Sequence, residues 1–361
     1  MGGPLSGLRV VELVGQGPGP YGSMILADLG CDVIAVERPE AAAKVDGSRP
    51  ATNPMMRGKR SVALDLKSSE GVAGLLALTD VADVFIDPFR PGVCERLGVG
   101  PDVATSRNNT LIYARMTGFG QTGPLATVAG HDINYIALSG ALSMLGFEGQ
   151  PPTFPINILG DFAGGGVMLA LGVAGAAFER SRSGVGQVID VAMVDGAAMI
   201  LGPMFAAATM GHWGARGTNH LDGGAPFYNV YETSDSEWVS IGAIEPQFHH
   251  ELYRLLEIAE PAQWQRDLWP AQKQVLADVF RARTRAEWCA LLEGTETCFA
   301  PVLSPTEVAA HPHTESRQIS TTINGVSQPA PAPRFSRTPA VAGTPCHPGS
   351  HHLDDVLSSW T

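Results

Sequence analysis

Short apolar runs alternate with helix-forming segments over roughly the first half of the chain. Runs with the length of buried strands lie at 8–14, 31–37, 61–66, 83–86, 111–116 and 187–193. Helices are predicted between them at 21–29 and 70–81, and a long apolar helix ends near Arg180. Because strands and helices alternate, we predict an open, mostly parallel, Rossmann-like α/β sheet.

The pattern changes near residue 225. Two runs, 227–233 and 237–244, flank the turn Ser234-Asp235-Ser236 and predict a β-hairpin, with helices after it. We therefore expect a small α+β domain beside the large one. The predicted bounds are 1–195 and 325–361 for the large domain, 225–315 for the small domain, and 196–224 and 316–324 for the linkers.

Charge and cysteine content narrow the class of protein. The chain has 24 basic and 36 acidic residues, and the net charge of −12 argues against nucleic-acid binding, which needs a basic face. Only 17% of the residues are charged, so we expect part of the surface to be buried against a partner subunit. Five cysteines without a CxxC pair predict reduced thiols and no zinc site.

The start of the chain lacks the basic and apolar regions of a signal peptide. Two uncharged runs of the chain, 162–178 and 196–211, fall short of the ~20 residues that a spanning helix needs. We therefore expect a cytoplasmic protein without a membrane span.

The loop after the first strand is rich in glycine but departs from a dinucleotide-binding fingerprint. Gly15 and Gly17 fit the G-x-G-x-x-G pattern, whereas Pro20 replaces the third glycine. Glu37, at the end of the second strand, is well placed for a ribose. Because the fingerprint is broken, a nicotinamide-dependent dehydrogenase is a weak alternative and a rigid turn is the simpler interpretation.

Three residues at the ends of predicted elements are candidates for acid–base chemistry. His131 begins a helix, where an imidazole tends to stay neutral and can act as a base near pH 7. Asp161 follows a predicted strand at 155–159 and is either a helix N-cap or a proton-transfer group. Glu245 follows an apolar strand and is either a helix cap or a group that orients a histidine. The residues alone leave these alternatives open.

Arginines near predicted strand ends are candidates for binding an anionic ligand. Arg38, Arg90 and Arg96 occupy positions where open α/β folds collect phosphates, although surface arginines are also common there. The chain has no HExxH and no G-x-S-x-G motif, so a zinc protease or a serine hydrolase is not predicted.

Motifs along nearly the whole chain resemble the family III CoA-transferase group. They include Gly17-Pro18-Gly19-Pro20, Ala27-Asp28-Leu29-Gly30, Leu64-Asp65-Leu66-Lys67, Arg90-Pro91-Gly92-Val93, Gly160-Asp161 and Ala332-Pro333-Arg334-Phe335-Ser336. Two further segments, 130–135 and 242–248, are similar to the racemase branch of that group.

The resemblance implies that CoA lies across the strand ends of the large domain. The contacts it implies are Arg38, Leu64, Asp65, Leu66, Lys67, Pro88, Phe89, Arg90, Arg96, Gly130, Asp132, Asn134 and Tyr135. The racemase pattern has a glycine and a tyrosine where this chain has Pro88-Phe89, so we expect the CoA contacts there to shift.

The resemblance also implies an activity and an assembly. The racemase branch interconverts (R)- and (S)-2-methylacyl-CoA thioesters through an enolate, without a metal, flavin or nicotinamide cofactor. His131 and Asp161 of one chain and Glu245 of its partner would form each site of an interlocked homodimer. The alternative is a family III CoA-transferase, in which the carboxylate of Asp161 is a nucleophile.

Overall fold

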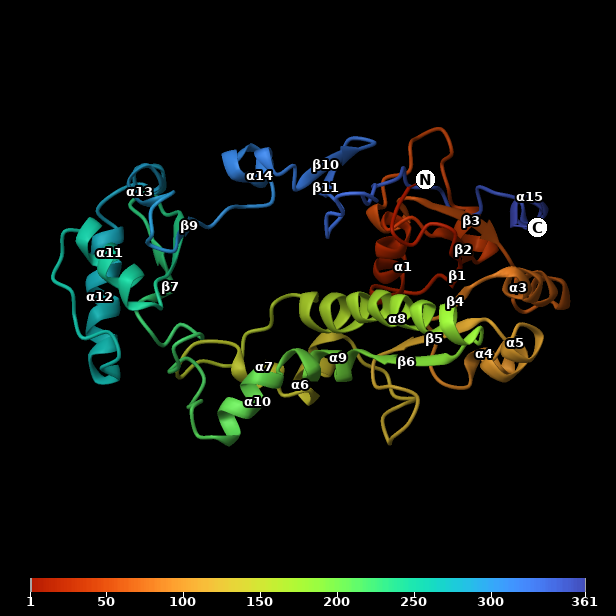
Figure 1. The fold of residues 1–361 in the computed structure, drawn as a ribbon, viewed down its shortest axis with the longest axis horizontal. Helices are drawn as coiled ribbons and strands as arrows, with labels where there is room; N and C mark the ends of the chain where they lie inside the picture. Colours follow the sequence, from red (N-terminus) through yellow and green to blue (C-terminus); the bar gives the residue numbers. More distant parts are fainter. Residues whose placement is uncertain (1, 361) are drawn as a thin grey trace. The chain divides into compact units, whose positions relative to one another are not determined.

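The computed structural model describes residues 2–360, which form two compact units (Figure 1). Unit 1 comprises residues 2–139, 155–201 and 312–360, and unit 2 comprises residues 140–154 and 202–311. The units therefore divide the chain at other positions than the predicted domains do. Residues 140–154 and 202–224 pack with unit 2, whereas 312–324 pack with unit 1.

Six parallel strands form the centre of unit 1, in the order β3-β2-β1-β4-β5-β6. Their bounds are β1 (Arg9–Leu13), β2 (Asp32–Glu37), β3 (Lys59–Ala63), β4 (Val84–Asp87), β5 (Ile112–Thr117) and β6 (Val188–Ala192). In register, Val11 of β1 lies between Ile34 of β2 and Phe85 of β4. The predicted open parallel α/β sheet is confirmed.

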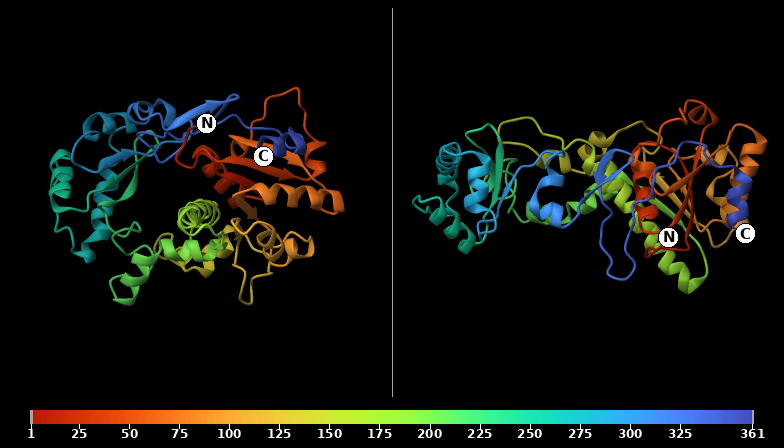
Figure 2. Two further views of the ribbon diagram at one scale, coloured as in Figure 1. Left: turned by 45° about the vertical axis from the view of Figure 1, so that its right-hand side comes forward. Right: turned by 90° about the horizontal axis from the view of Figure 1, so that it is seen from above.

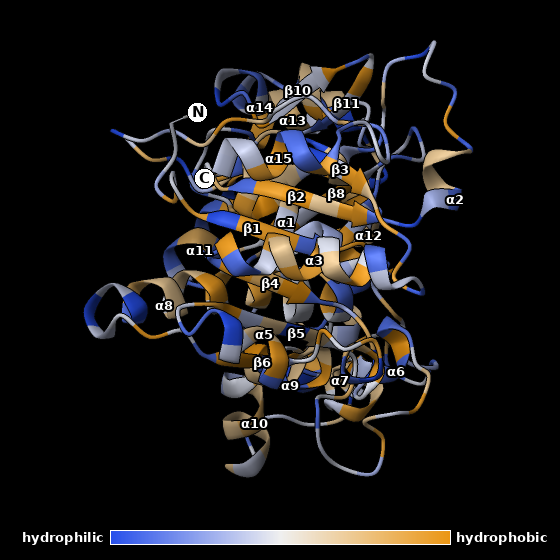
Figure 3. Cartoon of the chain, turned by 90° about the vertical axis from the view of Figure 1, so that its right-hand side faces the viewer, coloured by the Kyte–Doolittle hydropathy of each residue, from blue (hydrophilic) through white to orange (hydrophobic). Residues whose placement is uncertain are grey.

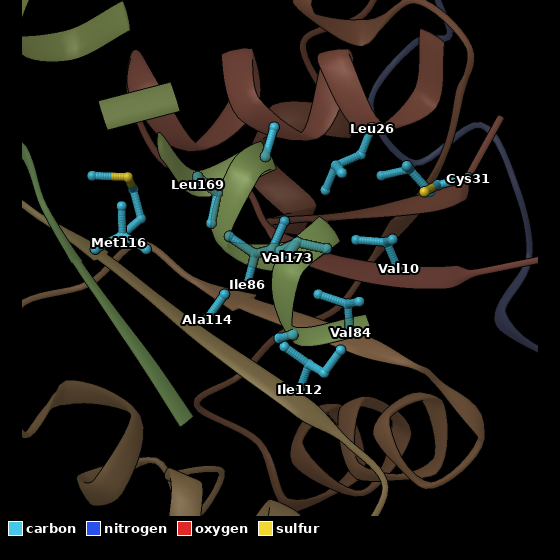
Figure 4. Packing of buried hydrophobic residues seen from close by; sticks show 14 of the residues in the cluster. Val10, Leu26, Cys31, Val84, Ile86, Ile112, Ala114, Met116, Leu169 and Val173 are labelled. Atoms are coloured by element: carbon cyan, nitrogen blue, oxygen red, sulfur yellow. The ribbon is translucent and has the colours of Figure 1, made fainter. Parts of the chain in front are cut away.

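Helices cover both faces of this sheet. On one face, Leu26, Leu169 and Val173 pack against strand residues such as Ile86 and Ala114 (Figure 4). On the other face, a second cluster joins helices, among them α4 (Val93–Arg96) through Cys94, to the strands, and the C-terminal helix lies beside the helix that follows β3 (Figure 2). Besides α4, the helices are α1 (Pro18–Asp28) and α8 (Met168–Ser183) on the first face, and α3 (Ser69–Val81), α5 (Pro101–Arg107) and α15 (Leu353–Trp360) on the second.

Because both faces are covered, the strands are hydrophobic along most of their length. Val33, Ile34 and Ala35 of β2 are fully buried in succession, as expected for a parallel strand between two helical layers. The hydropathy colouring follows this pattern, with hydrophobic residues in the middle of β2 and β4 (Figure 3).

Unit 1 also holds shorter elements that connect the layers. Helix α6 follows β5, α9 follows β6, and a β-hairpin precedes the C-terminal segment. Their bounds are α2 (Pro39–Ala42), α4 (Val93–Arg96), α6 (Asp132–Leu138), α9 (Met193–Ile200), α14 (Pro312–Ser316), β10 (Ser320–Ile323) and β11 (Val326–Pro329), with a π-helix η2 at Ile158–Val167.

The strand predicted at 155–159 is wrong. Residues 151–155 carry no regular structure, and the π-helix η2 begins at Ile158. Ile156 has φ of 44°, in the left-handed region, which interrupts an extended strand. Ile156 and Ile158 are also exposed, so their alternation does not mark a buried sheet face.

Unit 2 is a small α+β unit. The predicted hairpin is confirmed as the antiparallel pair β7 and β8, to which a third strand is added. Helices pack on this sheet through Leu252, Leu276 and Trp288. The elements are β7 (Tyr228–Glu232), β8 (Trp238–Gly242), β9 (Phe299–Pro301), α7 (Ala141–Met144), α10 (Gly202–Thr209), α11 (Pro246–Leu255), α12 (Trp269–Phe280) and α13 (Arg285–Leu292).

One helical segment of the described chain, Ile158–Ser183, is long and apolar enough to cross a membrane by length and composition. A single such helix is weak evidence, because core helices pass the same test. Leu169, Ala170 and Val173 are buried in the sheet cluster, while 39% of the apolar window as a whole is buried.

A fully buried ion pair joins three elements of unit 1. Lys59 Nζ of β3 donates to Glu12 Oε2 of β1 at 2.8 Å and to Ser23 Oγ of α1 at 2.7 Å. Both charged side chains have an exposed fraction of 0%. Two charges removed from water require each other, because either one alone would be left without compensation.

We therefore expect Lys59→Met to lower the free energy of unfolding by about 3–5 kcal/mol, since it leaves the Glu12 carboxylate buried without its partner. Guanidinium denaturation followed by circular dichroism measures this loss. The double variant Glu12→Gln with Lys59→Met removes both charges and should lose clearly less. Equal losses in the two variants would contradict this account of the pair.

Candidate active site

A cleft of about 610 Å³ opens at the carboxyl ends of the parallel strands in unit 1. Its walls include Gly15 after β1, Glu37 at the end of β2, Pro88 after β4, and Thr117 at the end of β5. The strand order reverses between β1 and β4, and the loops after both strands line the cleft. Open α/β sheets bind their ligands in such a crevice.

His131 lines this cleft at the start of α6. It is the N-cap residue of the helix, and its backbone N–H donates to Asn134 Oδ1 at 3.0 Å. The buried Tyr135, one turn further on, donates its hydroxyl to the carbonyl of Gly130. A side chain at Gly118 would place its Cβ 2.2 Å from the Tyr135 ring, so a glycine is required there.

Asp161 lines the same cleft from the first turn of the π-helix η2. Asn157 Nδ2 donates to Asp161 Oδ2 at 3.0 Å. Gly17, in the loop between β1 and α1, has φ of 56°, and a Cβ there would lie 3.2 Å from the same carboxylate oxygen. The glycine-rich loop therefore leaves room for the acid.

Burial raises the pKa of Asp161 above its usual value. The hydrogen bond from Asn157 lowers this pKa, the negative charge of Asp132 raises it, and the charge of His131 lowers it. The net shift is upward, so the protonated carboxyl is more favourable here than in a free aspartate. Such a group can donate a proton closer to neutral pH.

Asp132 follows His131 but turns away from the cleft. Its side chain is buried, and its Oδ2 accepts hydrogen bonds from the backbone N–H groups of Gly160 at 2.6 Å and of Asp161 at 2.7 Å. The carboxylate predicted to contact CoA is therefore engaged with the backbone beneath Asp161.

Several of the predicted residues lie together on the cleft. Besides His131 and Asp161 they are Arg38, Pro88, Phe89, Arg90, Gly130 and Tyr135. Arg38 and Arg90 are exposed, as expected of groups that bind a ligand in solution. The two guanidinium groups place two positive charges on a cleft that also holds the carboxyl groups of Glu37 and Asp161.

Other residues predicted to contact CoA do not line the cleft. Asn134 caps α6 through its side chain, and Arg96 is exposed at the end of α4. The segment after β3 has its two leucines against the sheet cluster and its charged residues exposed. The CoA contacts of Leu64, Asp65, Leu66, Lys67, Arg96 and Asn134 remain predictions.

Glu245 belongs to unit 2, where it is the exposed N-cap residue of α11. Burial, and then the charge of Glu245, raise the pKa of the Cys298 thiol nearby. A contact between Glu245 and the histidine of a partner chain remains a prediction.

Two polar contacts around the acid were missed from the sequence. Asn157 precedes Asp161 by four residues, and this helical spacing could have identified it. The contact of Asp132 with the backbone of Asp161 joins residues 29 positions apart. No local pattern predicts such a contact.

Comparison with known proteins identifies relatives of the whole chain. The model of CoA-transferase family III matches residues 5–352. Human and mouse alpha-methylacyl-CoA racemase are each 46% identical over 99% of this chain and 93% of their own. Acetyl-CoA:oxalate CoA-transferase from Acetobacter aceti is 32% identical over 91% of this chain and 88% of its own. The crystal structure of a CAIB/BAIF family protein from Brucella suis aligns over 100% of both chains, with a TM-score of 0.84 and 26% identity.

We expect Asp161→Asn to raise the free energy of unfolding at pH 7. A raised pKa means that the folded state binds this proton more tightly than the unfolded state, so ionisation destabilises the fold as pH rises through the folded pKa. The gain should shrink as pH falls toward the ordinary aspartate value of 3.8. Chemical denaturation at several pH values between 7 and 4 measures it.

Asp46→Asn is the matched control, because hydrogen bonds from Ser48 lower the pKa of Asp46. That variant should lose stability at pH 7, opposite in sign to Asp161→Asn. An Asp161→Asn protein no more stable than the wild type at pH 7 would show that the ionised carboxylate of Asp161 does not lower the free energy of unfolding.

Proposed function

Because the chain belongs to CoA-transferase family III, we propose that it is an isomerase that interconverts (R)- and (S)-2-methylacyl-CoA thioesters. The observation that carries this proposal is that an imidazole, His131, and a carboxyl with a raised pKa, Asp161, line one cleft. Inverting a carbon requires a base and an acid on opposite sides of it. Such thioesters belong to fatty acid and lipid metabolism, which is the context we propose.

The reaction is a 1,1-proton transfer. One group removes the proton from C2, and the electron pair of the C–H bond moves into an enolate whose charge rests on the thioester oxygen. The other group then donates its proton to the opposite face of C2, which forms a new C–H bond. Neutral His131 and protonated Asp161 are suited to one direction, and their charged forms to the other.

The enolate oxygen requires hydrogen-bond donors. The first two backbone N–H groups of α6, those of Asp132 and Ile133, precede the first intrahelical hydrogen bonds, whereas the N–H of Asn134 already donates to the carbonyl of His131. Since His131 is the N-cap of this helix, those groups lie next to the base. Preorganised donors of this kind stabilise a developing oxyanion. Proton transfer of this kind uses only groups of the chain, and CoA is part of the substrate.

CoA supplies phosphates that need positive partners. Arg38 and Arg90 are exposed on the cleft and are proposed to bind them, while Phe89 offers an apolar face to the adenine. A local pair of guanidinium groups attracts a polyanion even where the net charge is −12.

The second candidate is a CoA-transferase in which Asp161 attacks the thioester carbon. A nucleophilic carboxylate must be ionised, and isomerisation also uses the ionised Asp161 in one of its two directions, so the raised pKa of Asp161 does not separate the two reactions. The transferase reaction, however, needs no base at the position of His131. The presence of His131 on the cleft therefore favours isomerisation.

We expect the wild-type protein to exchange the C2 proton of a single 2-methylacyl-CoA enantiomer in D2O, with loss of optical purity. His131→Ala should lower the rate of exchange by about 10²–10⁴-fold, because it removes one proton-transfer group, while CoA affinity changes little. Proton NMR measures the exchange, chiral chromatography the inversion, and calorimetry the CoA binding. CoA transfer to an added carboxylate without exchange would favour the transferase instead.

We also propose that two copies of the chain form an interlocked dimer. The continuous helical segment of η2 and α8 buries Leu169 and Val173 on one side. On the other side it leaves exposed Val167, the last residue of η2, and Leu171 and Phe178 of α8. These three positions follow a helical spacing of four and seven residues, so they form one apolar stripe. A continuous apolar stripe of this kind is typical of a subunit interface.

A mixed dimer tests whether Glu245 acts on the site of its partner. Dimers of His131→Ala chains alone, or of Glu245→Ala chains alone, are expected to be inactive. When the two variants are coexpressed with different affinity tags, each mixed dimer should contain one site with both residues intact. The expected activity of an equal random mixture is about one quarter of wild type. Activity no higher than that of the separate variants would contradict shared sites, and size-exclusion light scattering verifies that mixed dimers form.

A further inference from the structure

We propose that Asp132 is a positioning residue that holds the backbone of Asp161 in register with His131. This inference rests on the proposed function, since it assigns a role within the same proton-transfer pair. The Asp132 side chain is not among the groups that line the cleft, and its Oδ2 accepts backbone hydrogen bonds instead. The role proposed here concerns this carboxylate and not the backbone N–H of Asp132.

The first step of the argument is the hydrogen bonding of the π-helix η2. A helix leaves its first N–H groups without intrahelical partners, and a buried N–H without a partner is costly. Gly160 is buried, and its N–H and that of Asp161 both donate to Asp132 Oδ2, at 2.6 and 2.7 Å. One carboxylate oxygen therefore satisfies two N–H groups at the turn that carries the acid.

The second step is the space that the chain leaves for this contact. A Cβ at Gly160 would lie 2.7 Å from Asp132 Oδ2 and 2.9 Å from its Cγ. Only a glycine allows the carboxylate to approach the backbone so closely. The contact therefore depends on two residues: the acid at 132 supplies the acceptor, and the glycine at 160 leaves room for it.

The third step is the place of Asp132 in the chain. It is the first residue of α6, directly after His131, which is the N-cap of that helix. The imidazole and the carboxylate that holds the backbone of Asp161 therefore belong to adjacent residues, His131 and Asp132. Residues 131 and 161 come from different elements, and this contact determines how far apart their backbones lie.

Two kinds of effect follow from this geometry. The hydrogen bonds hold Asp161 in place, and the nearby negative charge favours its protonated form. The ionisable groups that interact with Asp161 are Asp132, His131 and Tyr135, and Arg90 interacts in turn with Tyr135. A neutral residue at 132 that keeps the hydrogen bonds separates the two effects.

Two variants test the proposal. Asp132→Ala removes the acceptor and is expected to lower kcat for exchange by about 100-fold, because a small displacement of one reacting group is enough for such a loss. KM should change by less than about threefold, since the cleft itself is unaltered. Asp132→Asn keeps an oxygen that can accept both N–H bonds and should lose about tenfold or less in kcat.

The pH profile of exchange distinguishes this role from a structural one, because a change in stability alone would not shift the limbs of the profile. Without the charge at 132, the pKa of Asp161 should fall. Where Asp161 donates the proton, activity is lost above its pKa, so the basic limb of the profile should move to lower pH in Asp132→Asn. Where Asp161 accepts the proton, the acidic limb should move to lower pH as well. Starting from each enantiomer in turn measures the two directions.

A carbon-13 NMR titration of the Asp161 carboxyl, assigned by its absence in Asp161→Asn, follows the same pKa without any turnover. Absence of exchange in the wild type would overturn the proposed function, whereas a shifted titration in Asp132→Asn would still support the contact. A folded Asp132→Ala protein with kcat within about threefold of wild type, or an unshifted titration in Asp132→Asn, would overturn the inference.

Thr284→Ala is the control for general destabilisation. Thr284 caps α13 in unit 2 through a hydrogen bond from the N–H of Glu287, so its loss weakens a helix start outside the cleft. Thermal melts compare the melting temperature of this variant with those of the two Asp132 variants. It should keep the wild-type kcat and both pH limbs.

Discussion

Strands β1 and β4 pair side by side in the sheet, but their neighbours lie on opposite sides, so the chain leaves their carboxyl ends in two directions. The loops that follow, from Gly15 to Gly19 and from Pro88 to Arg90, both line one cleft, and they pack together at Pro88, since a Cβ at Gly15 would lie 2.8 Å from the Pro88 Cβ. Every other feature of the site is attached to this opening. The start of α6 brings His131 to it, and the first turn of η2 brings Asp161.

The sheet could be predicted because its strands are buried on both faces, which leaves uninterrupted apolar runs such as Val33 to Val36. Strand β3 begins two residues earlier than predicted, with Lys59. The lysine at the start of this edge strand is buried, and Glu12, 47 residues away, compensates its charge. That compensation depends on the tertiary fold, and no local pattern contains it.

The features of the site likewise differ in whether nearby or distant residues determine them. His131 was recognised as the start of a helix because capping depends on neighbours within one turn. The local setting of Asp161 was predicted as a strand followed by a helix, whereas a π-helix surrounds it. Its environment depends on Gly17, Asp132 and Asn157, and only the last of these lies close to it in sequence. Local chemistry was therefore easier to predict than the contacts that position it.

The three glycines in the middle of η2 carry a consequence for evolution and engineering. A Cβ at Gly164, Gly165 or Gly166 would lie within 3.0 Å of neighbouring helices, 2.8 Å from the Ala197 backbone in the first case and 2.6 Å from the Tyr21 ring in the last. Substitutions at these three glycines, which follow Asp161, would therefore force neighbouring groups to move. A library of variants gains little there, whereas Val128 lines the cleft and is 48% exposed, so a different side chain meets fewer neighbours at that position.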